Sequence, residues 1–158
     1  MAFQFLDSSS LAKKYINETG TNWVRNIFNA VPAHEIYVSR ITEVEITAAI
    51  VRRKKSGSLS ASDAALALQQ LRSDFLIRFR ILDVAAIIAT QACAIAQTYA
   101  LRGYDAVQLA SAIHVYNRLL SLGANPSQVP FTFISSDNEL NSAAQIEGLT
   151  IENPNNYP

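Results

Sequence analysis

Short apolar runs alternate along this chain with longer segments in which apolar residues recur at helical spacing. The runs are three or four residues long, which is typical of short buried strands. They occupy residues 3–6, 35–38, 79–82, 131–134 and 149–151. The segments with helical spacing occupy residues 8–16, 23–30, 42–55, 60–76, 85–101, 106–122 and 138–147. Because strands alternate with helices, the pattern predicts an α/β fold with a mostly parallel sheet covered on both faces.

Particular residues indicate how several of these helices begin, end and pack. Ser39 or Thr42 is expected to cap the helix after the second strand, and Thr42 and Glu45 have the spacing of a capping box. The basic residues 52–55 suit the C-terminal end of the same helix. Alanine and isoleucine dominate residues 85–101, so we expect that helix to be largely buried, with Cys93 as an inert core residue. Lys13 and Lys14 are expected to give the first helix a basic side.

The composition favours one compact domain. The chain has 158 residues, of which 49% are apolar and 16% charged, and we expect a single domain over residues 1–158. No apolar run approaches the ~20 residues that a membrane span needs. The single cysteine is typical of a reducing compartment, so a cytoplasmic location is expected. Thirteen basic and thirteen acidic residues balance, so any polyanion must be bound by local patches or through a metal ion.

Four acidic residues occupy comparable places in the predicted fold. Asp7 directly follows the first strand, and Asp137 follows the fourth strand. Glu45 lies in the first turns of the helix after the second strand, and Asp105 begins a helix after Gly103. The carboxyl ends of parallel strands meet at one edge of a sheet, where ligands of such folds bind. We therefore expect these carboxylates to converge there.

Convergent carboxylates favour a divalent cation, because like charges raise each other's pKa and a cation relieves this. Mg²⁺ prefers oxygen ligands and often links carboxylates to phosphates. A zinc site is not indicated, since His34 and His114 are isolated and are expected at the surface or its boundary. Taken singly, each aspartate is also a candidate helix cap, and Glu45 a capping-box residue. Ser9 and Ser135 are candidates to bind a phosphate or an ordered water, or to cap helices.

Five segments together resemble the PIN-domain nucleases, and among these the VapC-like toxins of type II toxin–antitoxin systems. They are residues 5–9, 38–45, 104–112, 133–137 and 147–154. The most specific part is Tyr104-Asp105-Ala106, followed by a strand that ends in Ser135-Ser136-Asp137. The resemblance implies a three-layer α/β/α sandwich over nearly the whole chain. It also implies a Mg²⁺ or Mn²⁺ site and the cleavage of single-stranded RNA.

The resemblance also implies site residues and partners. The acidic quartet of the family falls on Asp7, Glu45, Asp105 and Asp137, as metal ligands and catalytic groups. Glu43 competes with Glu45, but the spacing from Ser39 favours Glu45, and the two would point to different helix faces. A cognate antitoxin and a second copy of the chain, forming a homodimer, are the protein partners that such toxins have.

The hypothesis that follows is a metal-dependent endoribonuclease, with local cations for RNA among Lys13, Lys14, Arg40 and residues 52–55. The alternative is a catalytically silent PIN-like module that acts by forming a complex with an antitoxin or another protein. A phosphatase of the haloacid dehalogenase type is disfavoured, because Ser9 stands where such enzymes need a second aspartate. A phosphate-binding P-loop is absent from the sequence.

Overall fold

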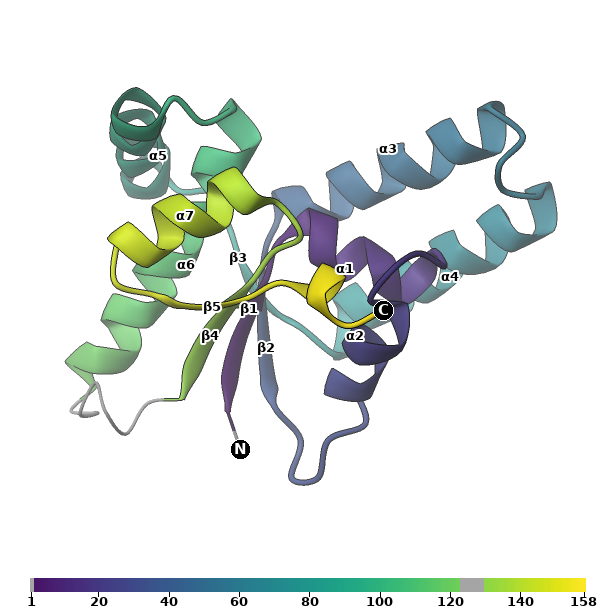
Figure 1. Ribbon diagram of the computed structural model, residues 1–158, viewed down its shortest axis with the longest axis horizontal. Helices are drawn as coiled ribbons and strands as arrows, with labels where there is room; N and C mark the ends of the chain where they lie inside the picture. Colours follow the sequence, from purple (N-terminus) through teal and green to yellow (C-terminus); the bar gives the residue numbers. More distant parts are fainter. Residues whose placement is uncertain (1, 123–129) are drawn as a thin grey trace.

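A computed structural model describes residues 2–122 and 130–158, and within these ranges five strands form one sheet (Figure 1). The strands are β1 (Phe3–Leu6), β2 (Glu35–Ser39), β3 (Arg80–Leu82), β4 (Phe131–Ile134) and β5 (Thr150–Glu152). Their order is β3-β2-β1-β4-β5, and every neighbouring pair is parallel. The central strand β1 aligns Phe5 with Tyr37 of β2 and Phe133 of β4. The predicted parallel sheet is therefore confirmed.

Helices cover both faces of this sheet. They are α1 (Ser8–Tyr15), α2 (Thr21–Ile27), α3 (Ile41–Lys55), α4 (Ala61–Ile77), α5 (Ala86–Tyr99), α6 (Gly103–Ser121), α7 (Asn138–Ile146) and the 3-10 turn η1 (Pro154–Asn156). Helices α1 to α4 pack on one face and α5 to α7 on the other (Figure 1). The fold is thus the expected three-layer α/β/α sandwich. Among the helices in the described ranges, none is sufficiently long and apolar to cross a membrane.

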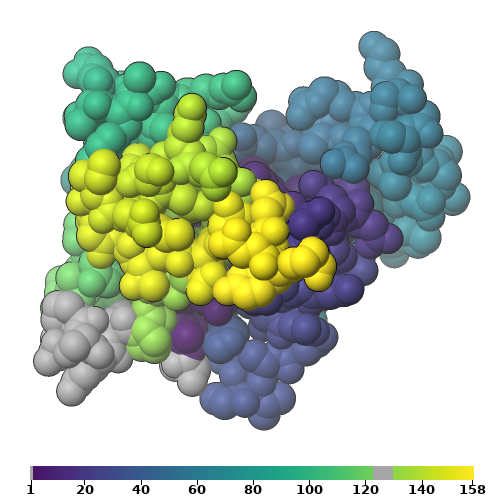
Figure 2. Space-filling view, in the orientation of Figure 1, coloured from purple at the N-terminus to yellow at the C-terminus, as the bar shows by residue number. Residues whose placement is uncertain are grey.

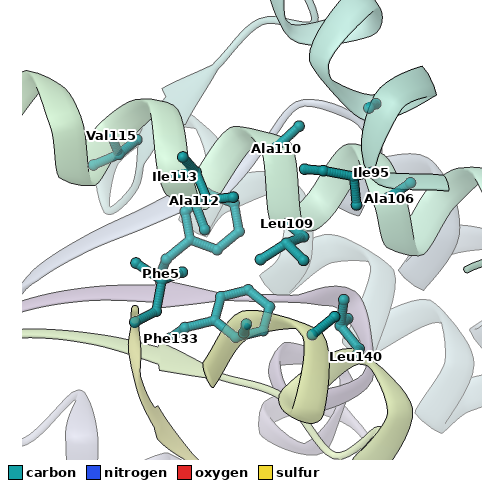
Figure 3. Packing of buried hydrophobic residues seen from close by; sticks show 14 of the residues in the cluster. Phe5, Ile95, Ala106, Leu109, Ala110, Ala112, Ile113, Val115, Phe133 and Leu140 are labelled. Carbon is teal, nitrogen blue, oxygen red and sulfur yellow. The ribbon is translucent and has the colours of Figure 1, made fainter. Parts of the chain in front are cut away.

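Two hydrophobic cores result, because successive residues of a strand point to opposite faces. Phe5 and Phe133 lie on the face of α5 to α7, with their ring centroids 5.9 Å apart. Figure 3 shows these residues between the sheet and Leu109 of α6. The next residues along, Leu6 and Ile134, belong to the core under α1 to α4. In β1 and β4 the two cores therefore occupy the last two residues of the strand, directly before the polar residues that follow.

Helix α5 is less buried than its composition predicts. Only Ile88, Ala92 and Ile95 are buried, while Ile87 is 65% exposed and Cys93 is also exposed. The predictions of a largely buried helix and of a core cysteine were wrong. The reason is that α5 packs mainly against α6 and so buries a single stripe at helical spacing.

The two lysines of α1 are also placed differently from the prediction. Lys13 and Lys14 are only 3% and 8% exposed, so they do not form an open basic side. Lys14 pairs with the buried Asp74 of α4, and the amine of Lys13 lies 3.5 Å from a carboxylate oxygen of Glu18. Because α2, α3 and α4 all pack against α1, even its polar residues are covered. Their charges are compensated inside the domain.

Gly20 fixes how the C-terminal segment joins the rest of the molecule. Its φ of +84° lies in the left-handed region, and α2 begins directly after it at Thr21, earlier than predicted. A Cβ at this position would lie 2.3 Å from the carbonyl oxygen of Pro154 in η1. The indole ring of Trp23 stacks on Tyr157 at 4.7 Å. In Figure 2 the C-terminal residues accordingly lie beside the first helices.

We predict that Gly20→Ala destabilises the protein more than Gly57→Ala. Gly57 has a similar φ of +78° but no atom within 4 Å of the added Cβ, so its substitution measures backbone strain alone. That strain should cost about 1 kcal/mol. Gly20→Ala should cost at least about twice as much, because the backbone at Pro154 must also move. Urea unfolding measures both values, and equal losses would show that the contact with η1 contributes nothing.

Candidate functional site

Asp7 connects the end of β1 to the start of α1. It is the N-cap of α1, and its Oδ1 accepts a hydrogen bond of 2.9 Å from the backbone N–H of Ser10. The hydroxyl of Ser9 donates to both carboxylate oxygens, at 2.9 and 3.0 Å. The hydroxyl of Ser135, at the end of β4, donates to Oδ2 at 3.1 Å. Asp7 is therefore held by donors from two neighbouring strand ends, and it does act as a helix cap.

Burial makes the charge of Asp7 costly. The side chain is 3% exposed, and loss of hydration raises its pKa from 3.8 to about 6. The hydrogen bonds from Ser10, Ser9 and Ser135 lower the pKa, but they do not cancel the effect of burial. A carboxylate in this state gains much from a nearby cation, because a positive charge favours its ionised form.

Asp137 is placed by the neighbouring strand β4. It is the N-cap of α7, where its Oδ1 accepts a 2.9 Å hydrogen bond from the N–H of Leu140. Its own N–H donates to the Ser135 hydroxyl at 3.0 Å, and the N–H of Ser136 donates to the Ser9 hydroxyl at 2.9 Å. Ser9 and Ser135 thus join the ends of β1 and β4. Both serine hydroxyls are already bonded to Asp7, and their binding of phosphate or water stays a prediction.

Glu45 reaches the same region from α3. Its Oε2 accepts hydrogen bonds from the hydroxyl of Ser8 and from the side-chain N–H of Gln108, the latter at 2.8 Å. Glu43 belongs to a different surface, where it lies 3.9 Å from the guanidinium of Arg40. Of the two glutamates that compete in the sequence, Glu45 is the one beside the start of α1.

The predicted capping box at the start of α3 does not form. The helix begins at Ile41, and its N-cap Arg40 makes no side-chain cap. Thr42 is fully buried and exchanges hydrogen bonds with the side chain of Gln108 in α6. Thr42 and Glu45 therefore face another helix instead of capping their own. Sequence reasoning missed Gln108 altogether, because a glutamine within an apolar helical pattern gives no signal of its contacts.

Asp105 lies in the first turn of α6 and is half-buried. Burial raises its pKa, and the negative charges of Asp137, Glu45 and Glu139 raise it further, whereas Arg102 lowers it. The helix begins at Gly103, so Asp105 is not the cap that its sequence position suggested. The fold therefore brings Asp105 close enough to Asp137, the N-cap of α7, and to Glu45 of α3 to experience their charge.

The arrangement is an open set of oxygen donors. Within residues 2–122 and 130–158, no three or more His, Cys, Asp or Glu side chains are spaced to hold a metal ion among them. The donors at this edge are nevertheless carboxylates and hydroxyls, and the buried Ser136 hydroxyl has no partner within the described ranges. This chemistry fits Mg²⁺ or Mn²⁺, which bind oxygen and, in the case of Mg²⁺, keep several water ligands. His34 and His114 lie apart at the boundary of the surface, as predicted.

A groove of about 440 Å³ opens beside these acids. Its lining includes Ser8, Ser9 and Glu45, and it continues between α1 and α3 to Lys13 and Arg52. The carboxylate region is therefore continuous with a surface that carries Arg52 and the paired charges of Lys13 and Glu18.

Comparison with known proteins identifies relatives of this chain. A ribonuclease of Mycobacterium tuberculosis, VapC45, is 30% identical over 115 residues, which is 73% of this chain and 78% of that protein. FitAcB from Neisseria gonorrhoeae has a TM-score of 0.62 at 18% identity, covering 96% of this chain and 97% of that one. A toxin–antitoxin complex from Klebsiella pneumoniae has a TM-score of 0.58 at 20% identity, covering 96% and 97%. At these identities the two structures establish a shared fold.

A family model also matches most of this sequence. The model of the PIN domain matches residues 5–132, from β1 into β4, and Asp137 lies just beyond this range. The matched range includes Asp7, Glu45 and Asp105, and the fold brings Asp137 to the same sheet edge. On the extent of this match and the identity to VapC45, the chain belongs to the PIN domain family.

Proposed function

We propose that this protein is a metal-dependent endoribonuclease that hydrolyses phosphodiester bonds of single-stranded RNA. The observation that carries the proposal is the position of Asp105. Its carboxylate is half-buried and lies near the negative charges of Asp137 and Glu45. Such a gathering of acids is unfavourable in an empty site and favourable around a cation. The names of the relatives, among them a ribonuclease, support RNA as the substrate.

The proposed ligands of Mg²⁺ or Mn²⁺ are Asp7, Glu45, Asp105 and Asp137. When bound, the cation would lower the pKa of a coordinated water and neutralise charge on the phosphate. The chain's own contribution is to hold these carboxylates in place: Ser9 and Ser135 fix Asp7 through their hydroxyls.

The groove between α1 and α3 is the proposed path of the RNA strand. Of the cations that the sequence offers, Lys14 is paired with Asp74, and Arg40 donates to Asp83 at 2.9 Å. Arg52 is exposed, lines the groove, and forms no ion pair within the described ranges. Lys13 also lines the groove, but it lies against Glu18. Arg52 is therefore the side chain best placed to contact a phosphate.

The biological role that we propose is the toxin of a type II toxin–antitoxin pair in the cytoplasm. A solved structure with this fold is a toxin–antitoxin complex, which supports a cognate antitoxin as the protein partner. A homodimer is proposed as well. The exposed Ile87 of α5 and Tyr104 of α6 are apolar surface that a second copy would cover.

We predict that Asp7→Asn abolishes RNA cleavage while Glu43→Gln retains it. Loss of a residue that only supports a ligand typically costs about 10–100-fold. Loss of the Asp7 carboxylate itself should therefore lower kcat at least about 100-fold. Glu43 pairs with Arg40 away from the acids, so it serves as the matched control.

The measurement is the cleavage of a fluorescent single-stranded RNA with Mg²⁺ or Mn²⁺ and with EDTA. Activity of Asp7→Asn that survives removal of contaminating nuclease would exclude the proposed role of Asp7. A parent protein without metal-dependent product would favour the silent binding module instead.

The pKa of Asp7 gives a second prediction, on metal-free protein. Because the folded pKa is about 6 and the ordinary value is 3.8, the folded state binds the proton more tightly. The contribution of Asp7 to the free energy of unfolding should therefore fall as pH rises from about 4 through 6. Asp7→Asn keeps a cap acceptor without a charge, so in EDTA at pH 8 it should be more stable by about 1–3 kcal/mol.

Urea unfolding at pH 8 and pH 4 tests this. The advantage of Asp7→Asn should disappear at pH 4, where both side chains are neutral in the folded state. Addition of Mn²⁺ at pH 8 should stabilise the parent protein and not the variant. A variant that is less stable than the parent at both pH values would contradict a costly buried charge at Asp7.

For the RNA path, we predict that Arg52→Ala raises KM about fivefold, equivalent to roughly 1 kcal/mol, with kcat within about twofold. Lys55→Ala is the control, because Lys55 is an exposed cation of the same helix outside the groove lining. Steady-state kinetics at low and high salt should show the difference shrinking as salt screens it. Equal KM values for the two variants would place the RNA elsewhere.

A further inference from the structure

Gln108 carries the strongest polar contacts near the acids that the proposed mechanism leaves unused. It lies in α6, one turn after Asp105, and is 1% exposed. Glutamine is mostly exposed in proteins, and a buried amide is costly unless its hydrogen-bonding groups find partners. Its complete burial here therefore requires an explanation from its surroundings.

Those surroundings are polar side chains from two other helices. The Nε2 of Gln108 lies 2.8 Å from Glu45 Oε2, 2.8 Å from the hydroxyl of Ser8 and 2.9 Å from that of Thr42. The Ser8 hydroxyl in turn donates to the same oxygen of Glu45. Glu45 Oε2 thus accepts from α1 and from α6, while Glu45 itself belongs to α3.

We propose that Gln108 is a positioning residue that holds the Glu45 carboxylate at the acidic edge of the sheet. This inference rests on the proposed function and names a residue that acts through Glu45. A glutamate has three rotatable bonds, and the negative charge at Asp105 repels its carboxylate toward solvent. Hydrogen bonds from the buried amide and from Ser8 oppose that movement, because donors to a carboxylate are strong when water is excluded.

Thr42 gives the amide of Gln108 a further contact. It is 0% exposed, and its hydroxyl also lies 3.3 Å from the Oε1 of Gln108. Because an ionised carboxylate can only accept hydrogen bonds, Glu45 itself keeps the NH₂ group directed at it, and the contact with Thr42 limits the movement of the amide. This accounts for Thr42 facing α6 instead of capping its own helix.

The test separates positioning from simple filling of the core. Gln108→Met keeps the length of the side chain and removes both N–H donors. If Gln108 positions Glu45, the variant should lose about 10- to 100-fold in kcat and about tenfold in Mn²⁺ affinity, measured by electron paramagnetic resonance. KM for RNA should change less than about twofold, because no contact with the RNA is removed.

A matched control lies on the same helix. Ser111 is 0% exposed, and its hydroxyl has no hydrogen-bond partner within the described residues, so Ser111→Ala removes a buried polar group of α6 that makes no hydrogen bond to Glu45. It should keep parental kcat and Mn²⁺ affinity. If Gln108→Met does not fold, Thr42→Val replaces it, since it removes only the anchor of the amide. Thr42→Val should then lower kcat and Mn²⁺ affinity in the same direction, by a smaller factor.

A further readout is independent of metal and of RNA. In metal-free protein, the side-chain NH₂ signals of Gln108 in the ¹⁵N NMR spectrum should shift with Glu45→Gln and stay in place with Glu43→Gln. An active parent with an equally active Gln108→Met, or NH₂ signals insensitive to Glu45→Gln, would overturn the positioning role alone. A parent that neither cleaves RNA nor binds Mn²⁺ would overturn the proposed function, and the positioning role with it.

Discussion

Negative charge gathered at one edge of a parallel sheet is the constraint on which this molecule depends. Strands β1 and β4 are neighbours, so Asp7 and Asp137 leave the sheet side by side. Asp105 enters from α6 and experiences the charge of the others. Repulsion and burial both oppose this arrangement. Its cost is offset within the chain by hydroxyl, amide and backbone N–H donors, each aimed at a carboxylate.

Different hydrogen bonds hold Asp7, Asp137 and Glu45 in place. These bonds allow a residue to stabilise the fold and also to serve as a metal ligand. Asp7 and Asp137 cap helices, and in each the cap bond uses a single oxygen, Oδ1, although serine hydroxyls also donate to Oδ2 of Asp7. Capping therefore orients these side chains without consuming the whole carboxylate. Glu45 has no cap to orient it and relies on Ser8 and Gln108 from other helices. A role in the fold and a role as ligand are thus compatible at the same residue.

Basic side chains near the acidic edge of the sheet are also paired within the chain. Most cations near the acids are already matched: Lys14 by Asp74, Lys13 by Glu18 and Arg40 by Asp83. Such pairing lets α1 be buried on several sides although it contains two lysines. Among the described residues that line the groove, the cation left for a polyanion is Arg52, so binding there would depend on a local contact and on the bound metal ion. Bulk charge would have little effect.

The order and type of the strands and helices could be predicted from the sequence, because short apolar runs and helical spacing each indicate a local backbone conformation. The placing of Asp7 and Asp137 after strands was equally local, and so was their capping. What the tertiary structure decided was pairing across distance: Lys14 with Asp74, and Thr42 with Gln108 in preference to a capping box. The exposure of Cys93 was decided in the same way, since composition cannot tell that α5 packs mainly on a single helix. Local pattern specifies where strands and helices form, and only packing decides which of their residues are buried and which partner each one meets.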